Sequence, residues 1–189
     1  MLYDEIISLL NKDNILNGGI FLNNGERPNI KIPLSWKDKT MILIATIPFI
    51  FMLLYLYMLW SDIPGVIPTH FGFSGVPDSF GSKSSLFIIV AIGVGTHILL
   101  SFLSKVPKFY NYPVSVTEKN AEVLYKIGRQ LILLIDLEVS VLINVLTWEN
   151  IQVAVGKMHG VTPLMFIIIG VMFFTIICEI IRMTKVQAE

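Results

Sequence analysis

Four long apolar runs are the feature that most constrains how this chain folds. They occupy residues 41–59, 85–103, 127–147 and 163–181. An α-helix rises ~1.5 Å per residue, so about 20 apolar residues are enough to cross the hydrocarbon core of a bilayer. Only 15% of the 189 residues are charged, against roughly 25% in ordinary soluble domains. The sequence therefore predicts an all-α, polytopic membrane protein that forms a bundle of four transmembrane helices.

Lysine and arginine are distributed unevenly among the segments that connect these runs. Eleven of the 14 lie before the first run, between the second and third, or after the fourth, whereas the other two loops contain only Lys83 and Lys157. Cytoplasmic loops are enriched in Lys and Arg. Both termini are therefore predicted to be cytoplasmic, and the loop of residues 61–84 is predicted to face the opposite side.

The chain divides into a cytoplasmic N-terminal segment (1–39), a membrane domain (40–182) and a short cytoplasmic tail (183–189). Residues 2–12 place apolar and polar side chains on opposite helical faces. Such a helix either lies on the membrane surface or packs on the bundle. Asn24–Gly25 lies between apolar stretches and is a hairpin signal.

Composition and missing motifs argue against several classes of protein. The net charge is zero, so no nucleic-acid partner is expected. The chain also lacks the His-Glu-x-x-His, Cys-x-x-Cys and Gly-x-Ser-x-Gly motifs. Residues 67–83, IPTHFGFSGVPDSFGSK, do not form a phosphate loop, because Ser82 separates Gly81 from Lys83. We expect no enzyme activity and no cofactor.

A metal site is also not expected, although metal-ligating side chains occur on the side predicted to face outward. Histidines from different loops have no fixed spacing, and the simpler interpretation is that they form hydrogen bonds at turns. The candidates considered were Asp62, His70, Asp78, Glu149 and His159.

Residues 67–83 are instead rich in turn-forming residues, which predicts a folded loop that recognises a ligand. The stretch also resembles the P-x-H-F-x-x-x-G-x-P-D-x-x-G-S-K signature of a bacterial membrane domain found in SdpI-like immunity proteins. The matching residues are Pro68, His70, Phe71, Gly75, Pro77, Asp78, Gly81, Ser82 and Lys83. All of these except Ser82 are predicted ligand-binding residues.

A second block, VPKFYNYPVSVTEKNAEVLYKIGR, resembles the stretch that follows in the same family. Its matching residues are Asn111, Tyr112, Pro113, Thr117, Asn120, Tyr125 and Arg129. The resemblance extends over residues 45–150. It implies a multi-pass protein of the bacterial cell membrane that protects against a secreted, sporulation-delaying peptide toxin. The immunity proteins themselves are longer and have more spans.

Helix starts can be predicted at three places. Ser115-x-x-Glu118 matches a capping box that would open the third helix. Ser82 and Thr162 are the predicted caps of the second and fourth helices. The cytoplasmic block (Asn111 to Tyr125) is interpreted either as a well-made helix start or as a docking surface for a cytoplasmic regulator.

The third run is the most polar of the four. Its residues Arg129, Asp136, Ser140 and Asn144 recur at steps of seven, four and four, which places them on one helical face. Glu138 points elsewhere, and His97 of the second run lies at a depth between Arg129 and Asp136. Charged groups in a span normally face protein or water. We expect an Arg129–His97–Asp136 polar core, or alternatively a proton or ion pathway. A pair between Glu179 and Arg182 is expected at the end of the fourth run.

These observations lead to several functional hypotheses. The first is toxin immunity through the loop 61–84. The second is a membrane sensor that sequesters a transcriptional regulator, and the third is a small transporter subunit. An intramembrane hydrolase is the least supported. The lipid bilayer is an expected partner, a peptide toxin and a regulator are possible ones, and a homo-oligomer is compatible with the sequence.

Overall fold

The computed structural model describes residues 27–186. Within these residues, four long helices run along the molecule, namely α2 (Trp36–Leu59), α3 (Ser85–Leu103), α4 (Ala121–Ala154) and α5 (Leu164–Thr184). All four are long and apolar enough to cross a membrane. The predicted all-α membrane bundle with four spans is therefore confirmed. The predicted helix 2–12 and the hairpin signal at Asn24–Gly25 lie outside the described residues.

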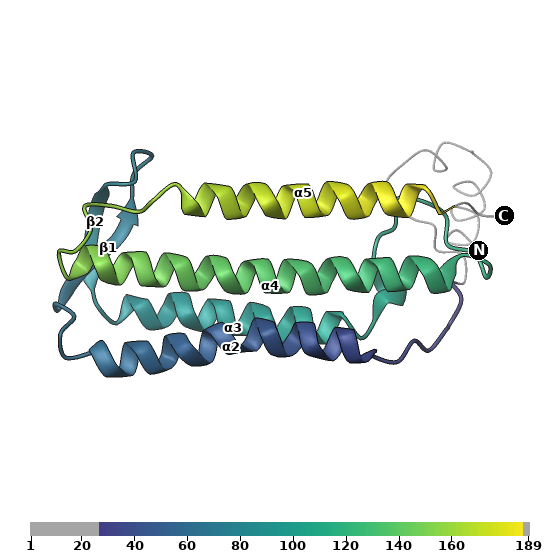
Figure 1. The fold of residues 1–189 in the computed structure, drawn as a ribbon, viewed down its shortest axis with the longest axis horizontal. Coiled ribbons are helices and arrows are strands. Elements are labelled where there is room, and N and C mark those ends of the chain that lie inside the picture. The colour runs from purple at the N-terminus through teal and green to yellow at the C-terminus, as the bar shows by residue number, and fades with distance from the viewer. Residues whose placement is uncertain (1–26, 187–189) are drawn as a thin grey trace, which may run out of the picture.

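Helix α4 is the centre of the bundle. It packs against α2 and α3 on one side and against α5 on the other, as the ribbon shows (Figure 1). Its 34 residues correspond to about 50 Å, which exceeds the ~30 Å hydrocarbon core of a bilayer. The ends of α4 therefore extend past the membrane core and connect the structures at the two ends of the bundle.

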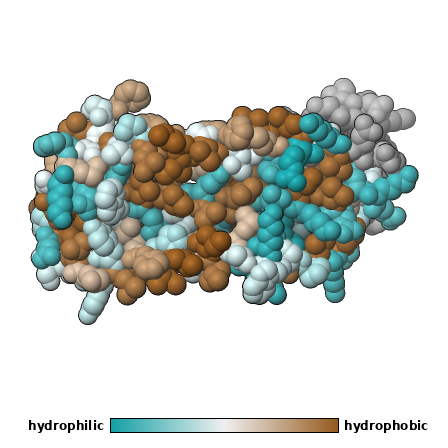
Figure 2. Space-filling view, viewed as in Figure 1, coloured by the Kyte–Doolittle hydropathy of each residue, from teal (hydrophilic) through white to brown (hydrophobic). Residues whose placement is uncertain are grey.

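Helix α5 contacts α4 along one face, and most of its other side chains are exposed and apolar. These include Phe166, Ile167, Phe173 and Phe174. Hydrophobic side chains cover much of the middle of the visible face, whereas hydrophilic ones gather toward the ends (Figure 2). This distribution is that of a bundle whose middle lies in hydrocarbon.

The loop between α2 and α3 contains a small sheet that the turn-rich sequence did not predict. Strand β1 (Val66–Phe71) pairs with β2 (Pro77–Ser82) in an antiparallel hairpin at one end of the bundle (Figure 1). The connecting turn is closed by hydrogen bonds from Gly72 N to Val76 O (2.9 Å) and from Gly75 N to Gly72 O (2.8 Å). Gly75 has φ = 78°, a left-handed conformation that glycine adopts readily.

Two hydrophobic clusters hold the ends of the bundle. The first joins the hairpin to the helices and contains Met52, Leu56, Ile63, Ile67, Leu86, Val90 and Ile151. The second lies at the opposite end and contains Leu124, Ile127 and Met183, with Tyr112 and Val114 packed against it. The hairpin is thus part of the folded core.

The predicted helix caps need correction. Helix α4 begins after Asn120 rather than at Ser115, because the Asn120 amide closes a turn ahead of the helix. Its Oδ1 accepts from Thr117 N (2.8 Å), and its Nδ2 donates to Ser115 O (3.0 Å). Helix α3 follows Ser84 rather than Ser82.

The fourth helix begins one residue later than predicted. Helix α5 follows Pro163, and the Thr162 hydroxyl accepts from Leu164 N at 3.3 Å. A full capping box occurs instead at α2, where Ser35 N donates to Asp38 Oδ2 (2.8 Å) and Asp38 N donates to Ser35 Oγ (3.1 Å).

Candidate functional site

The hairpin is fixed to the rest of the protein by hydrogen bonds from two other segments. Val161 N, in the α4–α5 loop, donates to Gly75 O at 2.9 Å. Asn150 Nδ2, near the end of α4, donates to Pro68 O at 3.0 Å. A Cβ atom on Gly160 would collide with the carbonyl of Gly75. Two backbones therefore approach closely here, and they hold the tip of the hairpin in one position.

Lys83 connects the base of the hairpin to the end of α2. Its Nζ donates to Trp60 O (2.7 Å) and Ile63 O (3.1 Å) and lies 4.5 Å from the centroid of the Trp60 ring. A cation is favourable at a helix C-terminus, where carbonyls lack intrahelical partners. The predicted ligand-binding residue Lys83 thus stabilises the connection from α2 into the hairpin.

His70 and Asp78 face each other across the two strands. His70 Nδ1 lies 2.6 Å from Asp78 Oδ1, and the two side chains are 68% and 51% exposed. Both groups are therefore accessible to a ligand. The pair is the part of the predicted loop site that displays polar chemistry on the surface.

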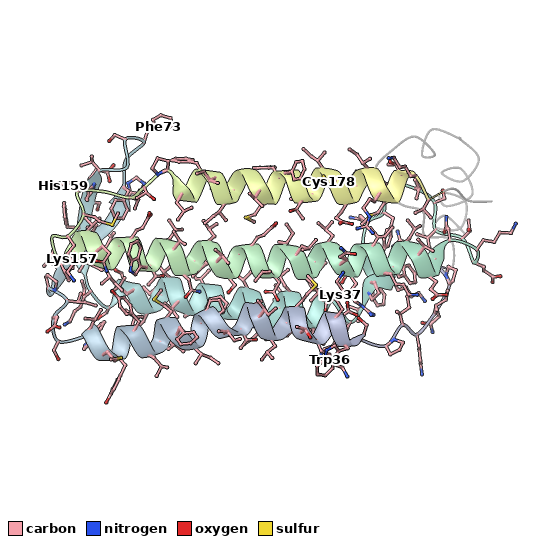
Figure 3. The ribbon with its side chains drawn as sticks, viewed as in Figure 1. Trp36, Lys37, Phe73, Lys157, His159 and Cys178 are labelled. Atoms are coloured by element: carbon pink, nitrogen blue, oxygen red, sulfur yellow. The ribbon has the colours of Figure 1, made fainter. Side chains whose placement is uncertain are left out.

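Apolar side chains are displayed beside this pair. Phe73 at the tip is fully exposed, and Val76 and Phe80 are more than half exposed. Figure 3 shows Phe73 projecting from the tip, away from the helices. We call the exposed side chains of His70, Phe73, Val76, Asp78 and Phe80 the hairpin surface.

The other predicted loop residues shape the hairpin. Pro68 is buried, and Phe71, Gly75, Pro77 and Gly81 are partly buried. A Cβ on Gly81 would lie 2.9 Å from Thr69 Cγ2 on the facing strand. The structure therefore brings all eight predicted ligand-binding residues onto one hairpin and displays His70 and Asp78 on its surface.

Of the candidate metal ligands, His70 and Asp78 contact each other, and the other three belong to other segments. Glu149 is buried, and its Oε1 accepts from the backbone N–H of Thr162 (3.2 Å) and from the Thr162 hydroxyl. His159 is exposed in the α4–α5 loop (Figure 3). Within residues 27–186, no group of three or more His, Cys, Asp or Glu side chains is arranged to hold a metal ion.

A second polar cluster lies inside the bundle, between α2, α3 and α4. His97 Nδ1 lies 2.9 and 3.0 Å from the two carboxylate oxygens of Asp136, and His97 Nε2 lies 3.0 Å from Thr46 Oγ1. His97 and Asp136 are both buried. The predicted contact between the second and third spans is therefore confirmed.

Further hydrogen bonds surround this cluster. The Thr46 hydroxyl donates to Ile42 O at 2.8 Å, which leaves its oxygen able to accept from His97 Nε2. The other ring nitrogen, Nδ1, faces the Asp136 carboxyl group. Ser101 Oγ donates to the same carboxylate at 3.3 Å.

The expected participation of Arg129 in this core is wrong. Its side chain is buried but points toward the end of the bundle that lies opposite the hairpin. There its Nε donates to Ser104 O (2.9 Å) and its Nη1 donates to Pro33 O (2.9 Å). Nη2 donates to Ile32 O at 2.6 Å. A long arginine side chain extends away from the apolar middle toward polar partners. Arg129 thus fastens residues 32–33 to α4.

The remaining polar residues of α4 form separate contacts. Glu138 accepts from the Thr175 hydroxyl of α5 at 2.6 Å, in agreement with the prediction that it faces away from Asp136. Asn144 Nδ2 donates to Ser140 O within its own helix at 2.8 Å. The expected Glu179–Arg182 pair is present at 2.7 Å.

The predicted cytoplasmic motif is a packed corner around aromatic rings. The hydroxyl of Tyr112 donates to Pro107 O (2.8 Å) in the short helix η2 (Pro107–Phe109), and its ring centroid lies 5.7 Å from that of Tyr125. Tyr110 OH donates to Leu103 O at 2.5 Å.

Burial raises the pKa of Tyr110 to about 12 and also raises that of Tyr112 above its usual value. Both hydroxyls are therefore protonated donors at neutral pH.

The rest of this motif is divided between the surface and the packed corner. Asn111 and Pro113 are exposed, whereas Thr117 is partly buried and Asn120 is buried. Tyr125 OH donates to Pro28 O at 3.1 Å. Of the predicted motif residues, Asn111 and Pro113 are therefore the ones displayed on the surface.

Sequence reasoning missed several residues that organise these sites. Asp38 was missed although Ser35-x-x-Asp38 is a sequence-level capping signal. No role was predicted for Trp60, whose carbonyl accepts from Lys83 Nζ, or for Arg27, which donates to Tyr110 O at 2.5 Å. No local pattern reveals their long-range partners.

Two comparisons with known proteins match parts of this chain. The model of a family described as "Domain of unknown function (DUF1648)" matches residues 35–94, which comprise α2, the hairpin and the first half of α3. An "Uncharacterized protein" of Archaeoglobus fulgidus is 30% identical over 89 residues, which are 43% of this chain and 49% of that protein. The chain thus spans about half the length of this relative. No solved structure matches the chain.

Proposed function

We propose that this multi-pass membrane protein recognises a secreted, membrane-active peptide at the hairpin surface and so protects the membrane from it. The observation that carries the proposal is a fixed hairpin that displays apolar side chains beside a polar pair. Phe73, Val76 and Phe80 are exposed, and the His70–Asp78 pair lies next to them. The chain would act in the cell membrane of a bacterium without catalysing a reaction.

The chemistry of the hairpin surface suits such a ligand. Peptides that insert into membranes combine apolar residues with polar or cationic ones, and the hairpin surface offers both kinds of contact. Strand β1 lies against α4, so the outer edge of the sheet belongs to β2. An extended peptide segment can pair with the edge of a sheet. Because the hairpin is already held in place, little conformational entropy is lost on binding.

The proposal is tested by membrane depolarisation in intact cells challenged with a sporulation-delaying-type peptide toxin. Four strains are compared at matched expression: no copy, wild type, the His70→Ala/Asp78→Ala variant and the His159→Ala variant. His159 is an exposed histidine on the neighbouring loop, so its replacement is the matched control. We expect wild type and the control to keep their membrane potential and the other two strains to lose it.

Two results would contradict the proposal. If cells with wild-type protein depolarise like cells with no copy, the protein gives no protection against this class of peptide. If the His70→Ala/Asp78→Ala variant protects as well as wild type, the polar pair does not take part in recognition. In that case a Phe73→Ser variant is tested in the same depolarisation assay. Loss of protection would indicate that the apolar tip recognises the peptide, and unchanged protection would indicate that another part of the protein does so.

A small transporter subunit is a second candidate, favoured by the buried His97–Asp136 pair. The two titratable side chains contact each other and are buried between three helices, as a proton-coupled site would require. Proton flux into liposomes that is present with wild type and lost with Asp136→Asn would support this alternative. Equal flux with both proteins would exclude a role for the pair in transport.

A further inference from the structure

A pocket lies at the end of the bundle opposite the hairpin, between the start of α2 and the first turns of α4. It has a volume of about 200 Å³. Its polar lining includes Ser35, Lys37, Asp38, Lys126, Arg129 and Gln130. None of the functional hypotheses above makes use of this pocket.

The lining of the pocket is strongly cationic. Lys37, Lys126 and Arg129 contribute three positive charges, against one negative charge from Asp38. Asp38 is already engaged, because its Oδ2 accepts from Ser35 N at 2.8 Å and lies 3.4 Å from Arg129 Nη1. An anion would therefore be attracted to this pocket.

The cations differ in how freely they can reach a ligand. Lys126 is paired with Glu122 at 2.5 Å, but both side chains are 59% exposed, and such exposed pairs are weak. Lys37 is exposed and lies on the first turn of α2, where Figure 3 shows it on a different side of the helix from Trp36. Both lysines can thus turn toward an anion in the pocket.

Arg129 supplies a fixed positive charge at the wall of the pocket. A guanidinium has five N–H donors. Within the described part of the chain, its acceptors are three carbonyl oxygens and the more distant Asp38 carboxylate. Neutral carbonyls do not cancel its charge, so the electrostatic attraction extends into the pocket.

The position of the pocket indicates the kind of anion. It opens near the start of α2, where Trp36 is 83% exposed, and exposed tryptophans are enriched at the membrane–water interface. Phosphate head groups of lipids lie at the same depth, and basic pockets between helix ends bind them. We propose that this pocket binds a phosphate group, with Lys37 and Lys126 as its charged contacts and Arg129 as a fixed charge behind them.

The site is independent of the proposed recognition at the hairpin, since it lies at the other end of the bundle. The test uses the purified full-length chain in a neutral detergent. Binding is measured by native mass spectrometry with phosphatidylglycerol, with zwitterionic phosphatidylcholine, and with inorganic phosphate added alone. The variants are Lys37→Gln/Lys126→Gln, the charge-preserving Lys37→Arg/Lys126→Arg, and Lys39→Gln.

Lys39→Gln is the matched control, because Lys39 is exposed on the same turn of α2 but does not line the pocket. We expect wild type, Lys39→Gln and the double-arginine variant to bind the phosphate compound, and the double-glutamine variant to bind about tenfold more weakly. Preference for phosphatidylglycerol over phosphatidylcholine identifies a lipid head group as the ligand. Binding of inorganic phosphate without phosphatidylglycerol identifies a soluble phosphate.

Three results would overturn the proposal. One is that neither phosphate compound binds to wild type. Another is that Lys39→Gln weakens binding as much as the double-glutamine variant, which would indicate diffuse attraction to a basic surface. The third is that the double-glutamine variant binds as tightly as wild type while eluting as a folded protein in size-exclusion chromatography.

Discussion

The imidazole of His97 lies 2.9 Å from the carboxylate of Asp136, and both side chains are buried between the helices. This contact joins α3 to α4, and Thr46 on the other side of the ring adds α2 at 3.0 Å. The pair therefore links α2, α3 and α4. Removing one partner leaves the other buried polar group without its hydrogen-bond partner in the pair.

The first prediction concerns the loss of this pair. We expect His97→Ala to lower the free energy of unfolding by about 3–5 kcal/mol, because the buried Asp136 loses both of its contacts with the imidazole. Asp136→Asn should cost less, since a neutral amide still forms hydrogen bonds with His97. Thermal unfolding in detergent measures both, with Ser101→Ala as a mild control for the 3.3 Å contact. Equal stability of wild type and His97→Ala would contradict the prediction.

The second prediction concerns Arg129 and the segment that it holds. Arg129→Lys keeps the charge but cannot reach the carbonyls of Ser104, Pro33 and Ile32 together, because an ammonium lacks the guanidinium fork. We expect residues 27–35 to be released from α4, which limited proteolysis detects as faster cleavage in this segment. Cleavage in the hairpin should not change. Unaltered cleavage of residues 27–35 would show that Arg129 does not hold them.

The sequence predicted the parts of this fold that depend on local hydrophobicity. Each run of about 20 apolar residues became a helix, because length and hydropathy alone determine a span. The contact of His97 with Asp136 was also predictable, since residue depth follows from the rise per residue. It was also predictable that Glu138 lies apart from His97 and Asp136, because it is on a different side of the helix from Asp136.

The parts that depend on long-range contacts were not predictable. The partners of Arg129 are carbonyls of residues 32–33, and no periodic pattern shows that this segment folds against α4. The hairpin was predicted as a loop because the stretch is rich in turn-forming residues, and Pro68, Pro77 and Gly81 are indeed unusual in strands. Its strands are stabilised by contacts with α4 and the α4–α5 loop. The cap at Asn120 was missed because Ser115 and Glu118 match a commoner pattern.

The third prediction concerns the close approach of the hairpin tip to the α4–α5 loop. A Cβ on Gly75 would lie 2.8 Å from Val161 O, and the residue has φ = 78°. We expect Gly75→Ala to cost about 1–3 kcal/mol through strain and displacement of the loop. Gly65→Ala is the matched control, because nothing lies within 4 Å of its Cβ position. Thermal unfolding compares the two, and equal midpoints would contradict the prediction.

The last prediction concerns the stability of the tyrosine corner at alkaline pH. Tyrosine ionises near pH 10 in the unfolded chain, whereas burial raises the pKa of Tyr110 to about 12 in the folded protein. Between these values the unfolded chain releases a proton that the folded protein retains. The stabilisation from Tyr110 is therefore complete below pH 10 and is lost as the pH rises toward 12.

We expect Tyr110→Phe to be less stable than wild type at pH 8 by about 1 kcal/mol, because the hydrogen bond to Leu103 O is lost. The difference between the two proteins should shrink as the pH rises from 10 to 11.5, since the variant has no hydroxyl to ionise at this position. Burial raises the pKa of Tyr112 in both proteins, and the charge of an ionised Tyr110 raises it further in wild type alone. Chemical unfolding in detergent at several pH values measures the difference, and a gap that stays constant would show that Tyr110 ionises equally easily in both states.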